Sequence, residues 1–295
     1  MEEKPAATAP LLESVGMTHT VTKLKGAGGK ISVFRYHGGR MAEGQSTDYG
    51  DFIIENFPLR ISVSKQTHAL PAPGREETRY ANFYVNPGGY VTAMHFNGQK
   101  MRKEGGIPLT IFYSGRVNVS YNTREHVTAV RYDFDDSQGG GETGLTRYEW
   151  EGSRLTHVIS DVARKGSFYE QHSLFTFHYA EATPSATAGN DCIYLEEMNV
   201  CPYLHDFMWY AGLFGRPLEE IPIGITCESM GDAPDWNTTI AVGVRRDSAG
   251  RAVTIHYGSG TNTAITYDNR ADDRDWGDTS SLLSRGGTGK SPAAP

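Results

Sequence analysis

Hydrophobic and polar residues alternate along most of this chain with a period of two, which is typical of β-strands. In residues 238–246, for example, Ile240, Val242 and Val244 alternate with Thr239 and Arg245. The alternating runs are rich in β-branched and aromatic residues and are bounded by Gly, Asn, Asp or Pro. They predict strands at residues 30–36, 59–64, 79–85, 91–96, 109–113, 116–121, 127–134, 146–151, 154–161, 168–179, 223–227, 238–246, 252–257 and 263–268.

The connections between these runs are short, so neighbouring strands are expected to pair antiparallel as a meander. Three of the connections, at residues 114–117, 150–155 and 248–252, place Gly at a predicted hairpin tip. Most predicted strands have five to eight residues and carry Thr, Ser, Arg and Glu on their second face. A membrane barrel uses strands of about 9–11 residues with an apolar outer band, and the pattern does not match one.

One stretch, residues 200–226, departs from alternation and has a helical period. Pro202 suits a first helical turn, and Gly212 and Gly215 suit the end of a helix. We therefore expect a short aromatic helix at residues 203–214, packed on the concave face of the sheet. Its expected core residues are Leu204, Phe207, Met208, Ala211, Leu213 and Phe214.

Together these patterns predict an all-β fold: an antiparallel meander in a strongly curved or barrel-like soluble sheet, with the one helix inside. A single β domain is expected over residues 21–271. Residues 1–20 are rich in Ala, Pro and Thr and are expected to form a flexible leader. Residues 272–295 are charged and then rich in Gly, Ser and Pro, which is typical of a disordered tail.

Charge and composition narrow the possible partners. The chain of 295 residues has a net charge of −7, and its Lys and Arg residues are scattered, so a nucleic-acid partner is not expected. No run of about 18 apolar residues is present, so no membrane-spanning helix is expected. The sequence as it stands also begins without a signal peptide.

Three cysteines, Cys192, Cys201 and Cys227, lie near the expected helix. They lack the Cys-x-x-Cys spacing of a metal site, and we interpret them as buried thiols, with one disulfide as the alternative. Two acidic clusters, residues 133–142 and 268–278, do not match a calcium-binding loop and are interpreted as a hairpin tip and part of the tail. No catalytic, metal-binding or cofactor-binding motif is recognised.

Aromatic residues at turns and strand ends are the candidate functional residues. Trp150, Trp236 and Trp276 all lie at such positions, where a ring could stack on a sugar. The alternative is that these rings cap the ends of the sheet.

Several segments between residues 110 and 270 resemble a Bacteroidales family of secreted proteins and predicted lipoproteins, a domain of unknown function with a porin-like fold. The resemblance rests on residues 148–158, 173–179, 210–226 and 252–257, which give hairpins, an aromatic helix ending in Gly-Leu-Phe-Gly, and a further hairpin. It implies a curved antiparallel sheet and a place in the cell envelope, periplasmic or at the extracellular surface. It implies no activity, cofactor or catalytic residue.

The resulting hypothesis is a non-catalytic envelope or cell-surface protein that binds an extracellular ligand such as a glycan. One alternative is a structural or assembly protein whose partner is another envelope protein. A second alternative is a hydrolase with catalytic residues on loops.

Overall fold

The computed structural model describes residues 20–268 with gaps, the longest at 26–30, 70–75, 181–193 and 202–208. Between residues 20 and 79 it describes the backbone of the strands, with side chains only at Gly44 and Ile53. The predicted leader, apart from Thr20, and the predicted tail lie outside the described residues. The domain limits of 21–271 therefore stay a prediction.

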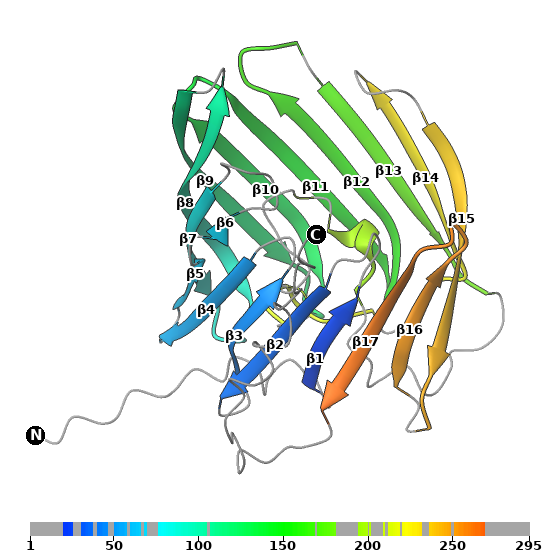
Figure 1. Ribbon diagram of the computed structural model, residues 1–295. Helices are drawn as coiled ribbons and strands as arrows, with labels where there is room; N and C mark the ends of the chain where they lie inside the picture. The colour runs from blue at the N-terminus through cyan, green and yellow to red at the C-terminus, as the bar shows by residue number, and fades with distance from the viewer. Residues whose placement is uncertain are drawn as a thin grey trace, which may run out of the picture.

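The described strands form one antiparallel sheet of 17 strands (Figure 1). In chain order they are β1 (Thr20–Lys25), β2 (Ile31–His37), β3 (Arg40–Ser46), β4 (Gly50–Phe57), β5 (Arg60–Lys65), β6 (His68–Ala69), β7 (Glu76–Val85), β8 (Val91–Glu104), β9 (Ile107–Tyr121), β10 (Val127–Asp136), β11 (Gly141–Glu151), β12 (Arg154–Arg164), β13 (Glu170–His178), β14 (Gly224–Gly231), β15 (Trp236–Arg246), β16 (Ala252–Tyr257) and β17 (Asn262–Asp268).

Each strand pairs with its neighbours in sequence, except that β5 and the short β6 both pair with β7. Strand β1 pairs with both β2 and β17, so the pairing returns to the first strand. The walls curve round a common interior (Figure 1). The all-β, antiparallel and barrel-like prediction is confirmed.

The predicted strand lengths are wrong for one half of the sheet. Strands β7 to β13 have between 9 and 15 residues. The predicted hairpin at residues 114–117 is also wrong, because Ser114 and Gly115 lie inside β9, which joins two predicted strands. Gly115 does not mark a turn because its missing side chain makes room for the ring of Phe96 on β8, where a Cβ atom would collide.

The other two predicted hairpins are present. Gly152 has a φ of 65° in the turn between β11 and β12, and residues 247–251 connect β15 to β16. Strands β1, β3, β4 and the two-residue β6 were not predicted. Residues 40–46, for example, contain no β-branched or aromatic residue, so pairing with neighbouring strands decides their conformation rather than local preference.

The expected helix falls largely on undescribed residues. Leu204, Phe207, Met208 and Ala211 lie outside the described part, within which only Trp209 is α-helical. A 3₁₀ turn, η4 (Glu196–Met198), is described before the expected helix. Gly212, inside the expected helix, and Gly215, just after it, have positive φ angles of 72° and 77°. Leu213 and Phe214 are buried, as predicted.

The described residues between 194 and 218, here called the plug segment, lie inside the curve of the sheet (Figure 1). Trp209 is at their centre: its ring lies 5.1 Å from that of Phe214, 5.4 Å from that of Tyr194 and 6.2 Å from that of Tyr148 on β11. The Trp209 indole donates a hydrogen bond to Asn199 at 3.1 Å. The segment thus joins its own aromatic residues to the strands.

Polar contacts hold both ends of the plug segment to the sheet. The Tyr148 hydroxyl donates to the carbonyl of Met198 at 2.7 Å, and the backbone N–H of Val91 donates to the carbonyl of Leu213 at 2.9 Å. Burial raises the pKa of Tyr148 well above its usual value. Arg216 pairs with Glu125 at 3.1 Å, which also accepts a hydrogen bond from the Tyr90 hydroxyl. The plug segment is therefore part of the core.

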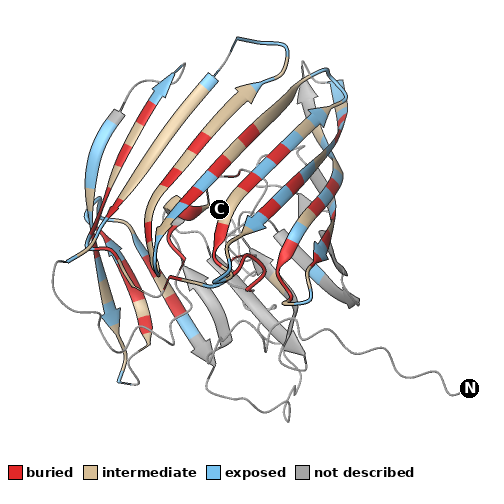
Figure 2. Ribbon diagram, turned by 180° about the vertical axis from the view of Figure 1, so that it is seen from behind, coloured by how far each residue is buried: buried red, intermediate tan, exposed pale blue. Residues whose placement is uncertain are grey.

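The face of the sheet that contacts the plug segment, here called the inner face, carries the core. Along β9, Ile111, Tyr113, Val117 and Val119 are buried while the residues between them are not. Figure 2 shows the same alternation on the neighbouring strands. Cys201 and Cys227 are buried and are not in a disulfide, as interpreted from the sequence, and Cys192 lies outside the described residues.

Candidate ligand-binding groove

A shallow groove of about 1180 Å³ lies on the opposite, outer face of the sheet, across β8 to β14. It follows from strand register, because residues that pair across neighbouring strands share a face. One row across the strands contains His95, Arg116, Asp133, Thr143, Ala163 and Glu170. The adjacent row contains Asn118, Arg131, Leu145, Asp161, His172 and Met230.

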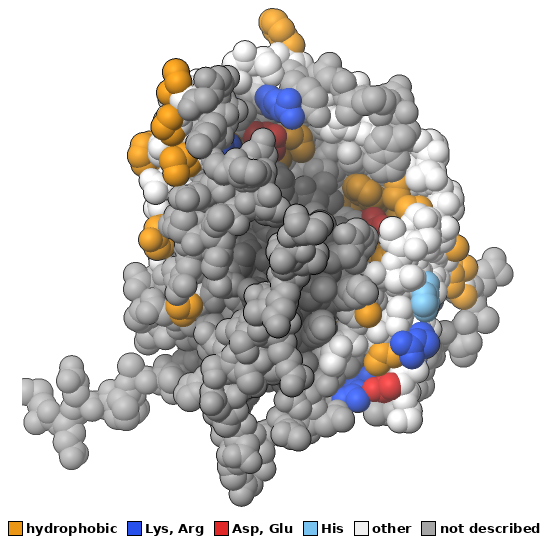
Figure 3. All heavy atoms as spheres, viewed as in Figure 1, with side chains coloured by type: hydrophobic (Ala, Val, Ile, Leu, Met, Phe, Trp, Pro, Cys, Tyr) orange, Lys and Arg blue, Asp and Glu red, His pale blue; other side chains and the backbone are white. Residues whose placement is uncertain are grey.

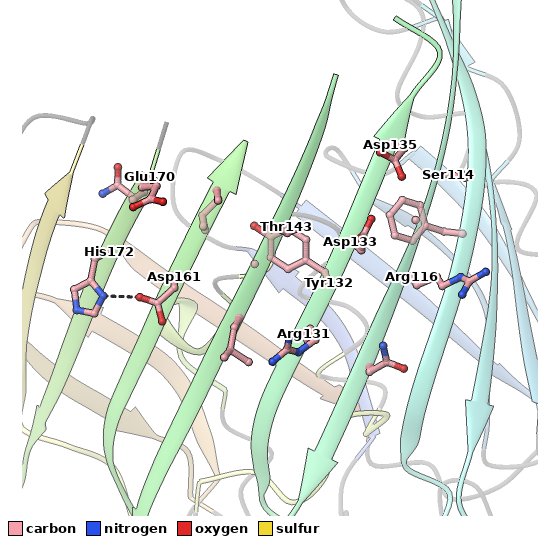
Figure 4. A pocket seen from close by; sticks show the side chains of 18 of the residues that line it. Ser114, Arg116, Arg131, Tyr132, Asp133, Asp135, Thr143, Asp161, Glu170 and His172 are labelled. Atoms are coloured by element: carbon pink, nitrogen blue, oxygen red, sulfur yellow. Dashed lines mark hydrogen bonds and ion pairs between the residues drawn. The ribbon is translucent and has the colours of Figure 1, made fainter. Parts of the chain in front are cut away.

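Three of the four carboxylates among the residues that line the groove are engaged by basic groups of the same chain. Asp161 lies 2.9 Å from Arg147 and 2.7 Å from the His172 Nδ1 atom (Figure 4). Asp133 and Asp135 lie 2.6 and 2.8 Å from the Lys165 ammonium. Hydrogen bonds from Lys165 to these two carboxylates raise its pKa. All of these side chains are partly exposed, so the pairs contribute little stability, but they offset the negative charge of the groove.

Two arginines of the groove differ from these groups. Arg116 on β9 and Arg131 on β10 are exposed, and neither has a hydrogen-bond or ion-pair partner among the described residues. Asp133 is the cross-strand neighbour of Arg116, but its carboxylate is directed to Lys165. The groove therefore presents two available guanidinium groups.

Exposed aromatic rings stand beside the groove at β7. Tyr80 is 53% exposed and is the cross-strand neighbour of Asn97, which lines the groove. Tyr84 is 41% exposed, and its ring meets that of His95 edge-on at 5.2 Å between centroids. Neutral hydrogen-bonding side chains, among them Asn97, Asn118, Ser114 and Thr143, also line the groove.

Of the three predicted tryptophans, only Trp150 has a described side chain. Trp150 is half-buried: its indole donates to the carbonyl of Val127 at 2.7 Å, and its ring stacks on that of the buried His126 at 4.1 Å. Trp236 is the first residue of β15, and only its backbone is described. Trp276 lies outside the described residues. For Trp150 the alternative role, packing at the end of a strand, agrees with these contacts.

The acidic cluster at residues 133–142 has a structural explanation. Asp136 accepts hydrogen bonds from the backbone N–H groups of Gln138 and Gly140 and so closes the turn between β10 and β11. No group of three or more metal-ligating side chains occurs in the part of the chain that the structure describes. Within the same part, no helix is long and apolar enough to cross a membrane.

Sequence reasoning missed Arg116, Arg131, Tyr80 and Tyr84 as site residues. Alternation marks each as facing away from the core, which is a usable signal. Their grouping depends on the register between strands, which a single sequence does not give. Arg116 was further obscured because it was assigned to the start of a strand after a hairpin.

Comparison with solved structures places this arrangement among known folds. The chain is similar to a porin-like protein from Bacteroides vulgatus ATCC 8482, with a TM-score of 0.51 and 14% identity over 85% of this chain and 100% of that one. This chain has a porin-like fold. The finding agrees with the resemblance seen in the sequence. At 14% identity, the similarity shows a shared fold and nothing about function.

A second porin-like protein, from Bacteroides uniformis ATCC 8492, matches 71% of this chain and 96% of its own length at 13% identity. Its TM-score of 0.27 is too low to support an argument. No family model and no curated protein matches the sequence. The porin-like fold therefore gives an architecture, and the function has to be argued from the groove.

Proposed function

We propose that this chain is a non-catalytic binding protein of the cell envelope, and that the outer-face groove holds an extracellular glycan. The observation that carries the proposal is the groove itself, where exposed rings, neutral hydrogen-bonding groups and two available guanidinium groups lie on one face. Saccharides offer hydroxyl groups for such donors and acceptors and flat C–H faces for the rings.

The distribution of side chains between the two faces supports binding on the outer face rather than passage through the interior. The inner face packs against the plug segment, whose Trp209 and Phe214 are buried. The outer face carries charged residues at mid-strand positions, such as Arg131 and Arg147, where a lipid-facing strand would be apolar. A location in the envelope, whether periplasmic or at the cell surface, and attachment by a lipid belong to the same proposal.

A glycan array, followed by isothermal titration of each hit, tests the binding function. We expect at least one saccharide to bind, and Tyr84→Ala to weaken that binding about tenfold through loss of ring stacking. Phe168→Ala is the matched control, because Phe168 is a fully exposed ring between β12 and β13 that does not line the groove. An array without hits, or equal losses in the two variants, would contradict the proposal.

A structural or assembly role is the second candidate, and one observation favours it. Phe168 is fully exposed and Ile107 is 72% exposed, each next to a strand end in the half of the sheet with the long strands. Such side chains are suited to a protein contact. A photo-crosslinking residue at position 168, used in the native host, should then capture one specific envelope protein. Recovery of no specific neighbour would count against this role.

A catalytic role lacks comparable support. His172 and Asp161 form the base-and-carboxylate pair that some hydrolases use, but within the described residues no hydroxyl or thiol is hydrogen-bonded to His172. We therefore do not include catalysis in the proposed function.

A further inference from the structure

We infer that the groove selects acidic saccharides, and that Arg116 and Arg131 bind the carboxylate groups of the ligand. The inference rests on the proposed glycan-binding function and adds the chemical class of the ligand. It follows from which charges of the groove are already paired within the chain and which are available.

Three of the four carboxylates among the residues that line the groove lie in ion pairs within the chain, and the fourth belongs to Glu170. Asp161 contacts both Arg147 and His172. Lys165 forms ion pairs with both Asp133 and Asp135. Arg116 and Arg131 have no such partner among the described residues. An arriving ligand therefore meets two guanidinium groups that are not engaged in an ion pair with the described residues.

Arginine is well suited to binding carboxylates in a groove open to solvent. Its planar guanidinium donates two parallel hydrogen bonds to one carboxylate, which gives orientation as well as attraction. Asn118 is the direct cross-strand neighbour of Arg131 and lies two residues along β9 from Arg116. Its amide provides a neutral partner for sugar hydroxyl groups between the two charges.

The placement of the two arginines favours a ligand with more than one acidic group. They lie on neighbouring strands in adjacent rows, as diagonal rather than direct neighbours. Figure 4 shows their side chains extending separately rather than converging on one point. A chain of uronate residues, in which carboxylates repeat along the polymer, can engage both groups, whereas a single small carboxylate can engage one.

The rest of the molecule does not supply this attraction. The net charge is −7, so the average field of the protein repels an acidic polymer. On the one face drawn in Figure 3, the Lys and Arg side chains of the described residues are scattered. Binding of an acidic saccharide should therefore depend on the groove and should weaken as salt screens the two guanidinium groups.

Isothermal titration with hexagalacturonate and with the neutral hexamer maltohexaose tests the inference. We expect hexagalacturonate to bind at least tenfold more tightly than maltohexaose in 50 mM salt, with the difference reduced in 500 mM salt. Replacing both arginines, as Arg116→Gln and Arg131→Gln together, should remove that preference. Arg124→Gln is the control, because Arg124 is an exposed arginine in the turn between β9 and β10 and does not line the groove.

The outcomes separate this inference from the proposed function. If both hexamers bind equally, the acidic class is wrong and glycan binding stands. If the double variant keeps its preference for hexagalacturonate, the assignment of carboxylate binding to Arg116 and Arg131 is wrong and glycan binding stands. If no saccharide binds in this titration or on the array, both the acidic-ligand inference and the proposed glycan-binding function are contradicted. Equal binding of a single-stranded DNA oligomer would show general attraction to polyanions and would also overturn the selection of saccharides.

Discussion

At the scale of single residues, Trp209 decides how the interior is filled. It is 1% exposed, and its ring contacts aromatic residues of the plug segment and of β11. Its indole N–H also donates a hydrogen bond, so the large side chain is well packed and its one polar group has a partner. The sequence analysis named Phe214 among the expected core residues of the helix but did not select Trp209.

Trp209→Ala should destabilise the protein by about 3–5 kcal/mol, because it leaves a large cavity at the centre of the inner face. Urea denaturation followed by circular dichroism measures the change. Phe112→Ala is the control, since Phe112 is 59% exposed on the outer face and its removal should change stability by about 0.5 kcal/mol or less. Equal losses in the two variants would show that the plug segment does not pack as described.

Two buried groups predict how stability depends on pH. Burial, with a smaller contribution from Glu197, raises the pKa of Cys227 from 9.0 to about 11. Burial and the nearby Glu125 carboxylate raise the pKa of Tyr90 from 10.0 to about 12. Both groups bind their protons more tightly when folded, so this contribution is complete below pH 9 and is lost as pH rises toward 12.

The denaturation midpoint should therefore fall steadily from pH 8 to pH 9.5 and pH 11. Above pH 10, the midpoint of the Tyr90→Phe variant should fall less steeply than that of the unsubstituted chain. A midpoint that is constant over this range would contradict the burial of these two groups.

At the scale of elements, the long strands β8 to β11 depend on glycines that face aromatic rings. A Cβ atom at Gly144 on β11 would collide with the ring of Tyr132 on β10, and one at Gly115 with the ring of Phe96. These rings cover the glycine backbone on the inner face and let neighbouring strands stay in register. The glycines are thus packing positions within continuous strands.

Gly144→Ala should cost about 1–3 kcal/mol, because either Tyr132 or the β11 backbone must move. Gly243→Ala is a matched control inside β15, where the nearest atom to an added Cβ is 4.0 Å away. That substitution should be neutral or stabilise by up to about 1 kcal/mol, since alanine loses less backbone entropy than glycine on folding. Similar thermal shifts for the two variants would exclude a special role for the Gly144 and Tyr132 pair.

These elements also show how far the sequence could predict the structure. Period-two alternation was enough for β7, β10, β12 and β15, where β-branched and aromatic residues coincide with burial. It failed where glycine inside a strand imitates a turn, as at Gly115, and where pairing overrides weak local preference, as in β3. The groove could not be predicted, because Arg116 and Arg131 meet through register, a property of strand pairs.

At the scale of the whole molecule, the two faces of the sheet have opposite characters. Side chains of the inner face pack with the plug segment, while the outer face carries paired charges, exposed rings and the groove. The porin-like fold is thus combined with an occupied interior and a polar exterior in the described half, β7 to β15. The proposed binding function depends on this arrangement, because it needs the outer face to meet water.

Thiol labelling at two neighbouring residues of β10 tests this arrangement most directly. Val130 is fully buried on the inner face, and Arg131 is exposed on the outer face. With Cys192 replaced by Ser and the buried Cys201 and Cys227 retained, Val130→Cys and Arg131→Cys are each treated with a polyethylene glycol maleimide. Arg131→Cys should react as a free thiol and Val130→Cys more than about 100-fold more slowly, because its reaction requires opening of the core. Equal rates, or a faster reaction at position 130, would contradict the assignment of the two faces.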